Sequence, residues 1–121
     1  ETAAEIQPVI LRIKERCAEL DREIDEDHFG AGFAVRFGSH NEPIVSKYNE
    51  IMRERLGKDP KEYSAIGDAD TMLELLKEFH EAGAHKFILR PIADGHADMI
   101  HQTKLLIEEL MPRIAKLNNE D

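Results

Sequence analysis

Two arginines and two histidines stand where the sequence predicts that strands end, and they carry the clearest chemistry in the chain. Arg36 lies near the end of the strand candidate over 28–37, and His40 follows shortly after it. Arg90 closes a second apolar run, and His96 lies in the loop beyond. A guanidinium binds oxyanions through a fork of N–H donors, and an imidazole exchanges protons near neutral pH. These residue types indicate anion binding and proton donation in a completed site.

The remaining histidines do not form a metal site by their spacing. His96 and His101 are five residues apart, a spacing that does not share a helix face well. His80 and His85 are also five apart, on either side of the expected helix stop at Gly83. The chain has a single cysteine, so a thiolate cluster is excluded. With no third ligand converging on either pair, the sequence predicts no metal centre.

The segment over 67–92 has the clearest secondary-structure pattern. Asp68 is a natural N-cap, because its carboxylate can accept from the free N–H groups one turn ahead, so a helix is expected from about Ala69. Apolar residues then recur at spacings of three and four and define one buried face: Met72, Leu75, Leu76 and Phe79. Gly83 is suited to the left-handed conformation that ends a helix. The apolar run Phe87–Leu89 does not alternate, which predicts a strand covered on both faces of a parallel sheet.

The strand candidate over 28–37 alternates between bulky and small side chains. Its bulky face carries Phe33, Val35 and Phe37. Its other face carries Gly30, Gly32, Ala34 and Arg36. A face with so little side-chain bulk permits close approach of another group, and we interpret it as a tightly packed interior, with direct ligand contact as the alternative.

Two prolines lie inside segments that otherwise read as helices. Thr2 and Glu5 have the form of a capping box, but Pro8 would then fall beyond the first turn, so the first helix either starts near Gln7 or is kinked. Its apolar stripe is Ile6, Val9, Ile10, Ile13, Cys17 and Leu20. In the last helix Pro112 predicts a kink or break. The apolar stripe there is Ile100, Thr103, Leu106, Ile107, Leu110, Met111, Ile114 and Leu117.

The predicted order is helix, strand, helix, helix, strand, helix, in one α/β segment over residues 1–121. Tyr63–Ile66 is the one further stretch with an extended pattern. Two strands are too few for an independent parallel sheet, so the chain is expected to be incomplete. The net charge of −9 argues against nucleic acid, because a phosphate backbone requires a basic surface. No apolar run approaches a membrane span of about 20 residues, and a cytoplasmic address is the default expectation.

The sequence GDADTMLELLKEFHEAGAHKFILRPI, with the terminal LLIEELMPRIAKL, is similar to the carboxyl-terminal end of bacterial-luciferase-like monooxygenases, a family of flavin- or deazaflavin-dependent oxidoreductases. The segment DEDHFGAGFAVRFG also resembles the preceding barrel strand in one branch of that family. The resemblance implies a (β/α)₈ TIM barrel of which this chain supplies the last two strands and their helices. The parent would use FMN or a deazaflavin, and most of the cofactor contacts would come from strands outside this chain.

The resemblance also places active-site residues at the carboxyl ends of the barrel strands. It implies that Arg90 and Arg36 bind the cofactor and that His40 and His96 contact the small-molecule substrate. An ion pair that ties the strand end to a helix is the structural alternative for Arg90. The isolated chain is expected to be inactive and to form a homo-oligomer, including by segment exchange. The competing function is a non-enzymatic assembly module that self-associates through strand edges and apolar helix faces.

Overall fold

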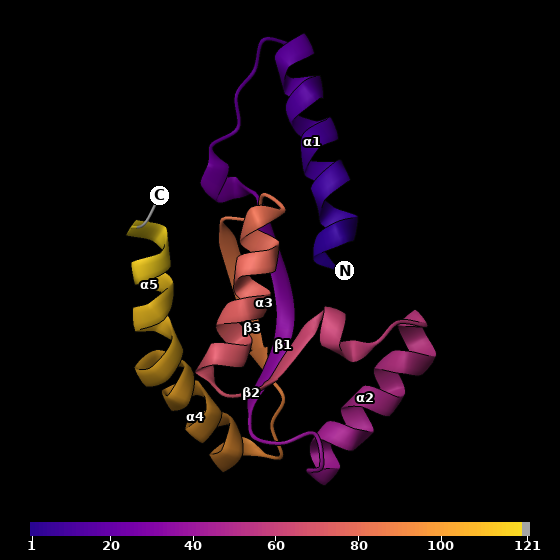
Figure 1. Cartoon of the computed structure of the whole chain (residues 1–121), viewed down its shortest axis with the longest axis vertical. Coiled ribbons are helices and arrows are strands. Elements are labelled where there is room, and N and C mark those ends of the chain that lie inside the picture. The colour runs from indigo at the N-terminus through magenta and orange to yellow at the C-terminus, as the bar shows by residue number, and fades with distance from the viewer. Residues whose placement is uncertain (120–121) are drawn as a thin grey trace.

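The computed structural model describes residues 1–119 as a mixed α/β arrangement around a small parallel sheet (Figure 1). The strands are β1 (Gly30–Phe37), β2 (Ser64–Gly67) and β3 (Lys86–Pro91), in the order β2-β1-β3. The helices are α1 (Ala3–Glu19), α2 (Pro43–Leu56), α3 (Ala69–Glu81), α4 (His96–Leu105) and α5 (Met111–Asn119). A π-helical turn over Leu106–Leu110 joins α4 to α5, and 3₁₀ turns cover Glu26–His28 and Pro60–Glu62.

The sheet contains one strand more than the predicted order. β2 pairs in parallel with the carboxyl half of β1, from Ala34 opposite Ser64 to Phe37 opposite Gly67. It lies within the stretch that the sequence indicated only as extended. A strand of four residues with a single branched apolar side chain carries too little periodicity to be distinguished from a loop.

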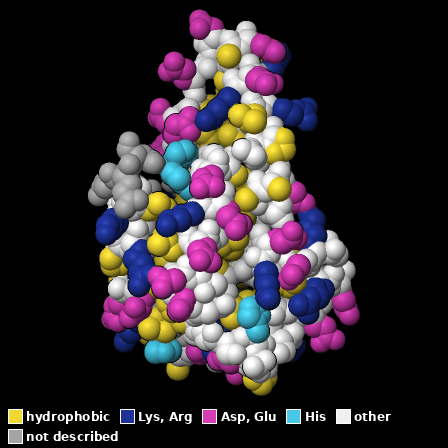
Figure 2. Space-filling view, in the orientation of Figure 1, with side chains coloured by type: hydrophobic (Ala, Val, Ile, Leu, Met, Phe, Trp, Pro, Cys, Tyr) yellow, Lys and Arg dark blue, Asp and Glu magenta, His cyan; other side chains and the backbone are white. Residues whose placement is uncertain are grey.

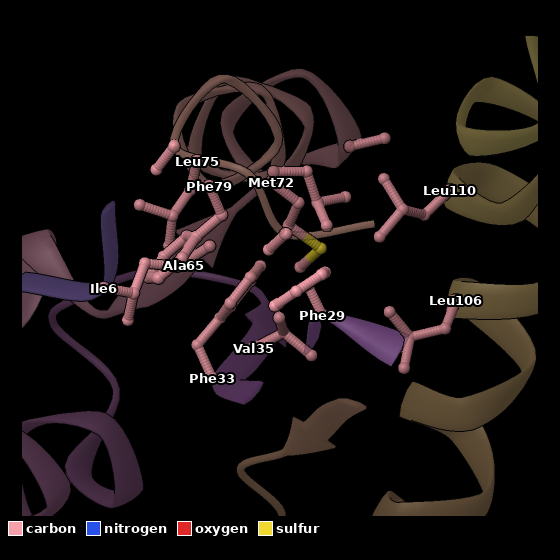
Figure 3. Packing of buried hydrophobic residues seen from close by; sticks show 14 of the residues in the cluster. Ile6, Phe29, Phe33, Val35, Ala65, Met72, Leu75, Phe79, Leu106 and Leu110 are labelled. Atoms are coloured by element: carbon pink, nitrogen blue, oxygen red, sulfur yellow. The ribbon is translucent and has the colours of Figure 1, made fainter. Parts of the chain in front are cut away.

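The main core lies on one face of the sheet. Phe33 and Val35 of β1 are buried there, and the Phe33 ring stacks on Phe79 of α3 with ring centroids 5.4 Å apart. Figure 3 shows Ile6 of α1 and Leu110, next to α5, converging on the same cluster from opposite sides. The helices α1, α3 and the α4–α5 pair therefore cover the same face, and the predicted bulky face of β1 is confirmed.

Local signals in the sequence account for the ends of α3. The Asp68 carboxylate accepts a hydrogen bond from the Thr71 N–H at 2.9 Å, and the helix begins at Ala69 as predicted. The four predicted apolar residues of this helix are buried. Gly83 has φ of +112°, and a Cβ there would lie 3.2 Å from the Ile10 side chain, so glycine serves both the turn and the approach of α1.

The two internal prolines are accommodated differently. The Thr2–Glu5 capping box is present, and α1 begins at Ala3 and continues through Pro8. Before Pro112 the chain widens into the π-helical turn, and Figure 1 shows α4 and α5 at an angle to each other, so the predicted irregularity is found there. The two apolar stripes are only partly buried, because side chains on each remain exposed: Val9, Ile13, Leu20, Ile100, Ile107 and Met111.

The other face of the sheet is largely open, and the prediction that β3 is covered on both faces is wrong for the described residues. Burial alternates along β3, and the Ile88 side chain on the open face is 64% exposed. Gly30 and Gly32 of β1 lie opposite Lys86 and Ile88 in the register. A small second cluster covers only the carboxyl end of this face, beneath α2: Ala34, Val45, Ile66 and Ile92.

Candidate functional site

The carboxyl end of β1 is fixed by a buried arginine. Arg36 is 7% exposed, and its Nε and Nη2 donate to the two carboxylate oxygens of Glu42, each at 3.1 Å. Its Nη1 donates to Asp98 Oδ2 at 2.7 Å and to the Ile92 carbonyl oxygen at 2.8 Å. The contact with Glu42 is the bidentate geometry that a guanidinium fork favours. One side chain thus joins the end of β1 to the start of α2, to the end of β3 and to α4.

Charge reinforces this arrangement. The hydrogen bonds from Arg36 hold the pKa of Glu42 and of Asp98 below the ordinary carboxyl range, with further lowering by the backbone N–H groups of Ser39 and Asp94. The two carboxylates in turn raise the pKa of Arg36 further above its usual value. An incoming phosphate would have to compete with two carboxylates for the same cation. The geometry therefore favours a positioning role for Arg36 over direct cofactor contact.

A buried glutamine completes the attachment of α4. Gln102 is 2% exposed, and its side-chain amide exchanges two hydrogen bonds with the backbone of Phe37. Sequence reasoning missed Gln102, Glu42 and Asp98. No sequence signal marks Gln102, because it lies between the polar residues His101 and Thr103 and its partner is 65 residues away in the chain.

Arg90 occupies a different setting on the open face. Its side chain lies over Gly32, where an added Cβ would come within 2.8 Å of Arg90 Nη1. Its positive charge also opposes the rise in the pKa of Tyr48 that burial causes. Among the residues that the structure describes, no carboxylate lies within ion-pair distance of Arg90. Gly32, which has no side chain, leaves room for the Arg90 guanidinium. The exposed N–H groups of Arg90 are open to an anion on that face.

The structure does not bring the two candidate histidines into one pocket. His40 Nδ1 lies 3.3 Å from Asn49 Nδ2, beside a cavity of about 210 Å³ between β2 and α3. That cavity is lined by His40, Lys61, Ser64, Ala65, Ile66, Thr71, Glu74, Leu75 and Glu78. His96 is the exposed first residue of α4. Each histidine lies near a strand's carboxyl end, as the sequence indicated, but neither lines a cavity with Arg90.

Two other groups of titratable side chains lie at the opposite end of the sheet. The rings of His80 and His85 meet edge to face with centroids 4.7 Å apart, and His85 Nε2 lies 3.3 Å from Glu26. The ligand-type atoms of the second group, Asp25, Asp27 and His28, lie within 4.8 Å of one another. All three residues of that group are exposed, and exposed acidic groups of this kind are common without an ion.

Comparison of the chain with protein-family models, curated protein sequences and solved structures gives no match. Among the described helices, none has the length and apolar character needed to cross a bilayer. The fold is a mixed α/β arrangement with a three-stranded parallel sheet.

Proposed function

We propose that this chain is the carboxyl-terminal part of a luciferase-like (β/α)₈ barrel that uses FMN or a deazaflavin, and that Arg90 binds an anionic group of the cofactor. The observation that carries the proposal is the asymmetry of the sheet. The helices α1, α3 and α4–α5 cover one face, while Arg90 lies without a carboxylate partner among the described residues on the other. A barrel has its helices outside and the strands' second face inside, and α2, which covers the carboxyl end of that second face here, departs from this arrangement.

The strand pairing is compatible with such a barrel. β1 and β3 are parallel neighbours, as adjacent barrel strands are, and the chain between them runs through α2, β2 and α3. β2 pairs with only the carboxyl half of β1. The edge of β1 over 30–33 is therefore left for a preceding strand.

Within this proposal, the environment of each site residue decides its role. Arg90 is the cofactor-binding residue, because it is exposed on the inner face and has a glycine beneath it. Arg36 maintains the carboxyl end of β1 through its hydrogen bonds to Glu42 and Asp98. His40 and His96 follow the ends of β1 and β3 and are assigned to substrate contact. The isolated chain is inactive in this proposal, since the other strands supply the rest of the cofactor site.

Cofactor titration of the full-length parent tests the proposal. Arg90→Ala is expected to weaken FMN or deazaflavin binding by about 10- to 100-fold, the loss of one or two charge-assisted hydrogen bonds. Lys86→Ala is the matched control, because it removes a cation from the same strand and the same face. Equal affinities for wild type and Arg90→Ala would refute the assignment.

A second candidate function is self-assembly without catalysis. It is favoured by the apolar side chains of α1 that no described residue covers, of which Val9 and Leu11 are each 54% exposed. A homo-oligomer that buries α1 would satisfy them. Sedimentation of the chain at micromolar concentration tests this, and a monomer would exclude it.

A further inference from the structure

Tyr48 of α2 packs onto the open face of the sheet with its hydroxyl group unpaired among the described residues. The ring of this half-buried residue packs against the second cluster, which includes Ala34 of β1. The hydroxyl of the other tyrosine, Tyr63, donates to the Lys58 carbonyl, whereas no described residue accepts from or donates to the Tyr48 hydroxyl. A phenol hydroxyl at the border of an apolar surface usually has a hydrogen-bond partner, so this one is available to a bound group.

The position of α2 over this face is set by its apolar side and by Arg36. Val45 and Asn49 are buried one turn apart, and Tyr48 lies between them on the same side of the helix. Figure 2 shows charged side chains gathered on the outer surface of α2. Glu42, the N-cap of α2, is held by the Arg36 guanidinium. The start of α2 is thus attached to the end of β1, and Tyr48 is carried over the sheet.

Arg90 and Tyr48 flank the same part of β1. Arg90 pairs with Ala34 in the register, and its guanidinium lies over Gly32. Gly32 and Ala34 are alternate residues of one strand and therefore lie about 7 Å apart on the same face. The Arg90 charge opposes the rise in the pKa of Tyr48 that burial causes, as expected for a cation close to the phenol. The guanidinium and the phenol hydroxyl therefore face one space above two small residues.

The two side chains together fit a phosphate monoester. The fork of a guanidinium donates to two oxygens of an anion, which occupies both oxygens of a carboxylate. A phosphate monoester has three terminal oxygens, so one oxygen remains for a further donor. The Tyr48 hydroxyl is suited to that oxygen, because burial raises the pKa of the phenol and keeps it protonated at neutral pH.

We propose that Arg90 and Tyr48 together bind a phosphate monoester, with the guanidinium on two of its oxygens and the Tyr48 hydroxyl on the third. This inference rests on the proposed function, which assigns Arg90 to an anionic group of the cofactor. It adds a second residue, from α2, and the chemical class of that anionic group. Of the two cofactors considered, it favours FMN, which carries a phosphate monoester. It also gives α2 a role at the carboxyl end of the strands, where barrel ligands bind.

Amide NMR titration of the chain with methyl phosphate tests the inference without a flavin. Tyr48→Phe removes the hydroxyl but keeps the ring, and it is expected to weaken methyl phosphate binding about tenfold. Tyr63→Phe is the matched control, because the hydroxyl that it removes bonds to the Lys58 carbonyl, and it should leave the affinity unchanged. Dimethyl phosphate lacks the third terminal oxygen and should bind wild type and Tyr48→Phe equally.

Alkaline titration of the tyrosine absorbance gives a second readout, which a purely structural role of Tyr48 would not change. In the Tyr63→Phe background Tyr48 is the only tyrosine. Arg90→Ala should raise the pKa of Tyr48, because it removes the cation that stabilises the phenolate. Saturating methyl phosphate should also raise this pKa, because a bound anion disfavours the phenolate.

The outcomes separate this inference from the proposed function. A loss of methyl phosphate affinity in Arg90→Ala, with none in Tyr48→Phe, would overturn the inference and leave the role of Arg90 intact. Unchanged affinity in both variants would overturn the inference and the assignment of Arg90 together. The inference alone would fail if the wild-type chain did not bind methyl phosphate, or if Tyr48→Phe weakened both phosphates equally.

Discussion

The side-chain amide of Gln102 pairs with the backbone of Phe37 through both of its polar groups. Gln102 Oε1 accepts from the Phe37 N–H at 2.8 Å, and Gln102 Nε2 donates to the Phe37 carbonyl at 3.1 Å. This is the hydrogen-bond pair that a neighbouring strand would make, supplied here by a helix. It satisfies the last residue of β1 and fixes α4 at the carboxyl end of the sheet.

The first prediction concerns this pair. Gln102→Leu preserves the volume but leaves a partly buried N–H and C=O of Phe37 without their Gln102 partners, which is expected to cost about 2 kcal/mol of unfolding free energy. Urea denaturation measures the change. Thr103→Val is the control, because among the described residues the Thr103 hydroxyl donates to the Met99 carbonyl within the same helix, and its loss is expected to cost well under ~1 kcal/mol. Similar stabilities for the two variants would contradict the role of Gln102.

The second prediction concerns Arg36. Arg36→Met keeps much of the side-chain volume but removes four hydrogen bonds and leaves Glu42 and Asp98 facing each other, so we expect a loss of about 3 kcal/mol or more. The double variant Arg36→Met with Asp98→Asn is expected to recover part of this loss, because one unpaired charge is removed. No recovery in the double variant would show that the ion pairs contribute little.

The pH dependence of stability follows from the same residues. The folded-state pKa values of Glu42 and Asp98 lie below their usual values, so both groups release protons more readily in the folded chain. Their stabilisation is complete above the unfolded pKa values, near 4, and is lost as the pH falls through the lower folded values. We expect the unfolding free energy to decline below about pH 4.5 in the wild type. Asp98→Asn should show a shallower decline over the same range, and parallel curves would contradict this linkage.

Local signals allowed much of the fold to be predicted from the sequence. The Asp68 cap, the stop at Gly83 and the alternation along β1 each depend on residues a few positions apart, and all three are found. The Arg36 arrangement was not predictable in this way. Asp98 lies 62 residues from Arg36, and only the parallel pairing of β1 with β3 brings them together.

In the candidate site, too, single residues could be predicted from the sequence, but the contacts between distant residues could not. The sequence identified Arg90 as a cation at a strand end and Gly32 as a position without bulk. It did not indicate that one lies over the other, because that relation depends on the register between β1 and β3. The open face was also hidden from sequence reasoning, since an apolar run such as Phe87–Leu89 reads the same whether one face or two are covered.

The last prediction tests the contact between Gly32 and Arg90. A Cβ on Gly32 would lie 2.8 Å from Arg90 Nη1 and 3.3 Å from the Ile88 carbonyl oxygen. The nearer atom is the end of a flexible side chain, so Gly32→Ala is expected to displace the guanidinium while changing the unfolding free energy by no more than about 1 kcal/mol.

On the proposed function, the same substitution in the complete barrel should weaken cofactor binding by a factor similar to that of Arg90→Ala. The double variant Gly32→Ala with Arg90→Ala should be no weaker than Arg90→Ala alone, because the alanine acts only by moving the arginine. Fluorescence titration of the bound flavin measures all three variants. Additive losses would instead show that Gly32 contacts the ligand directly, which was the alternative interpretation of the small-residue face.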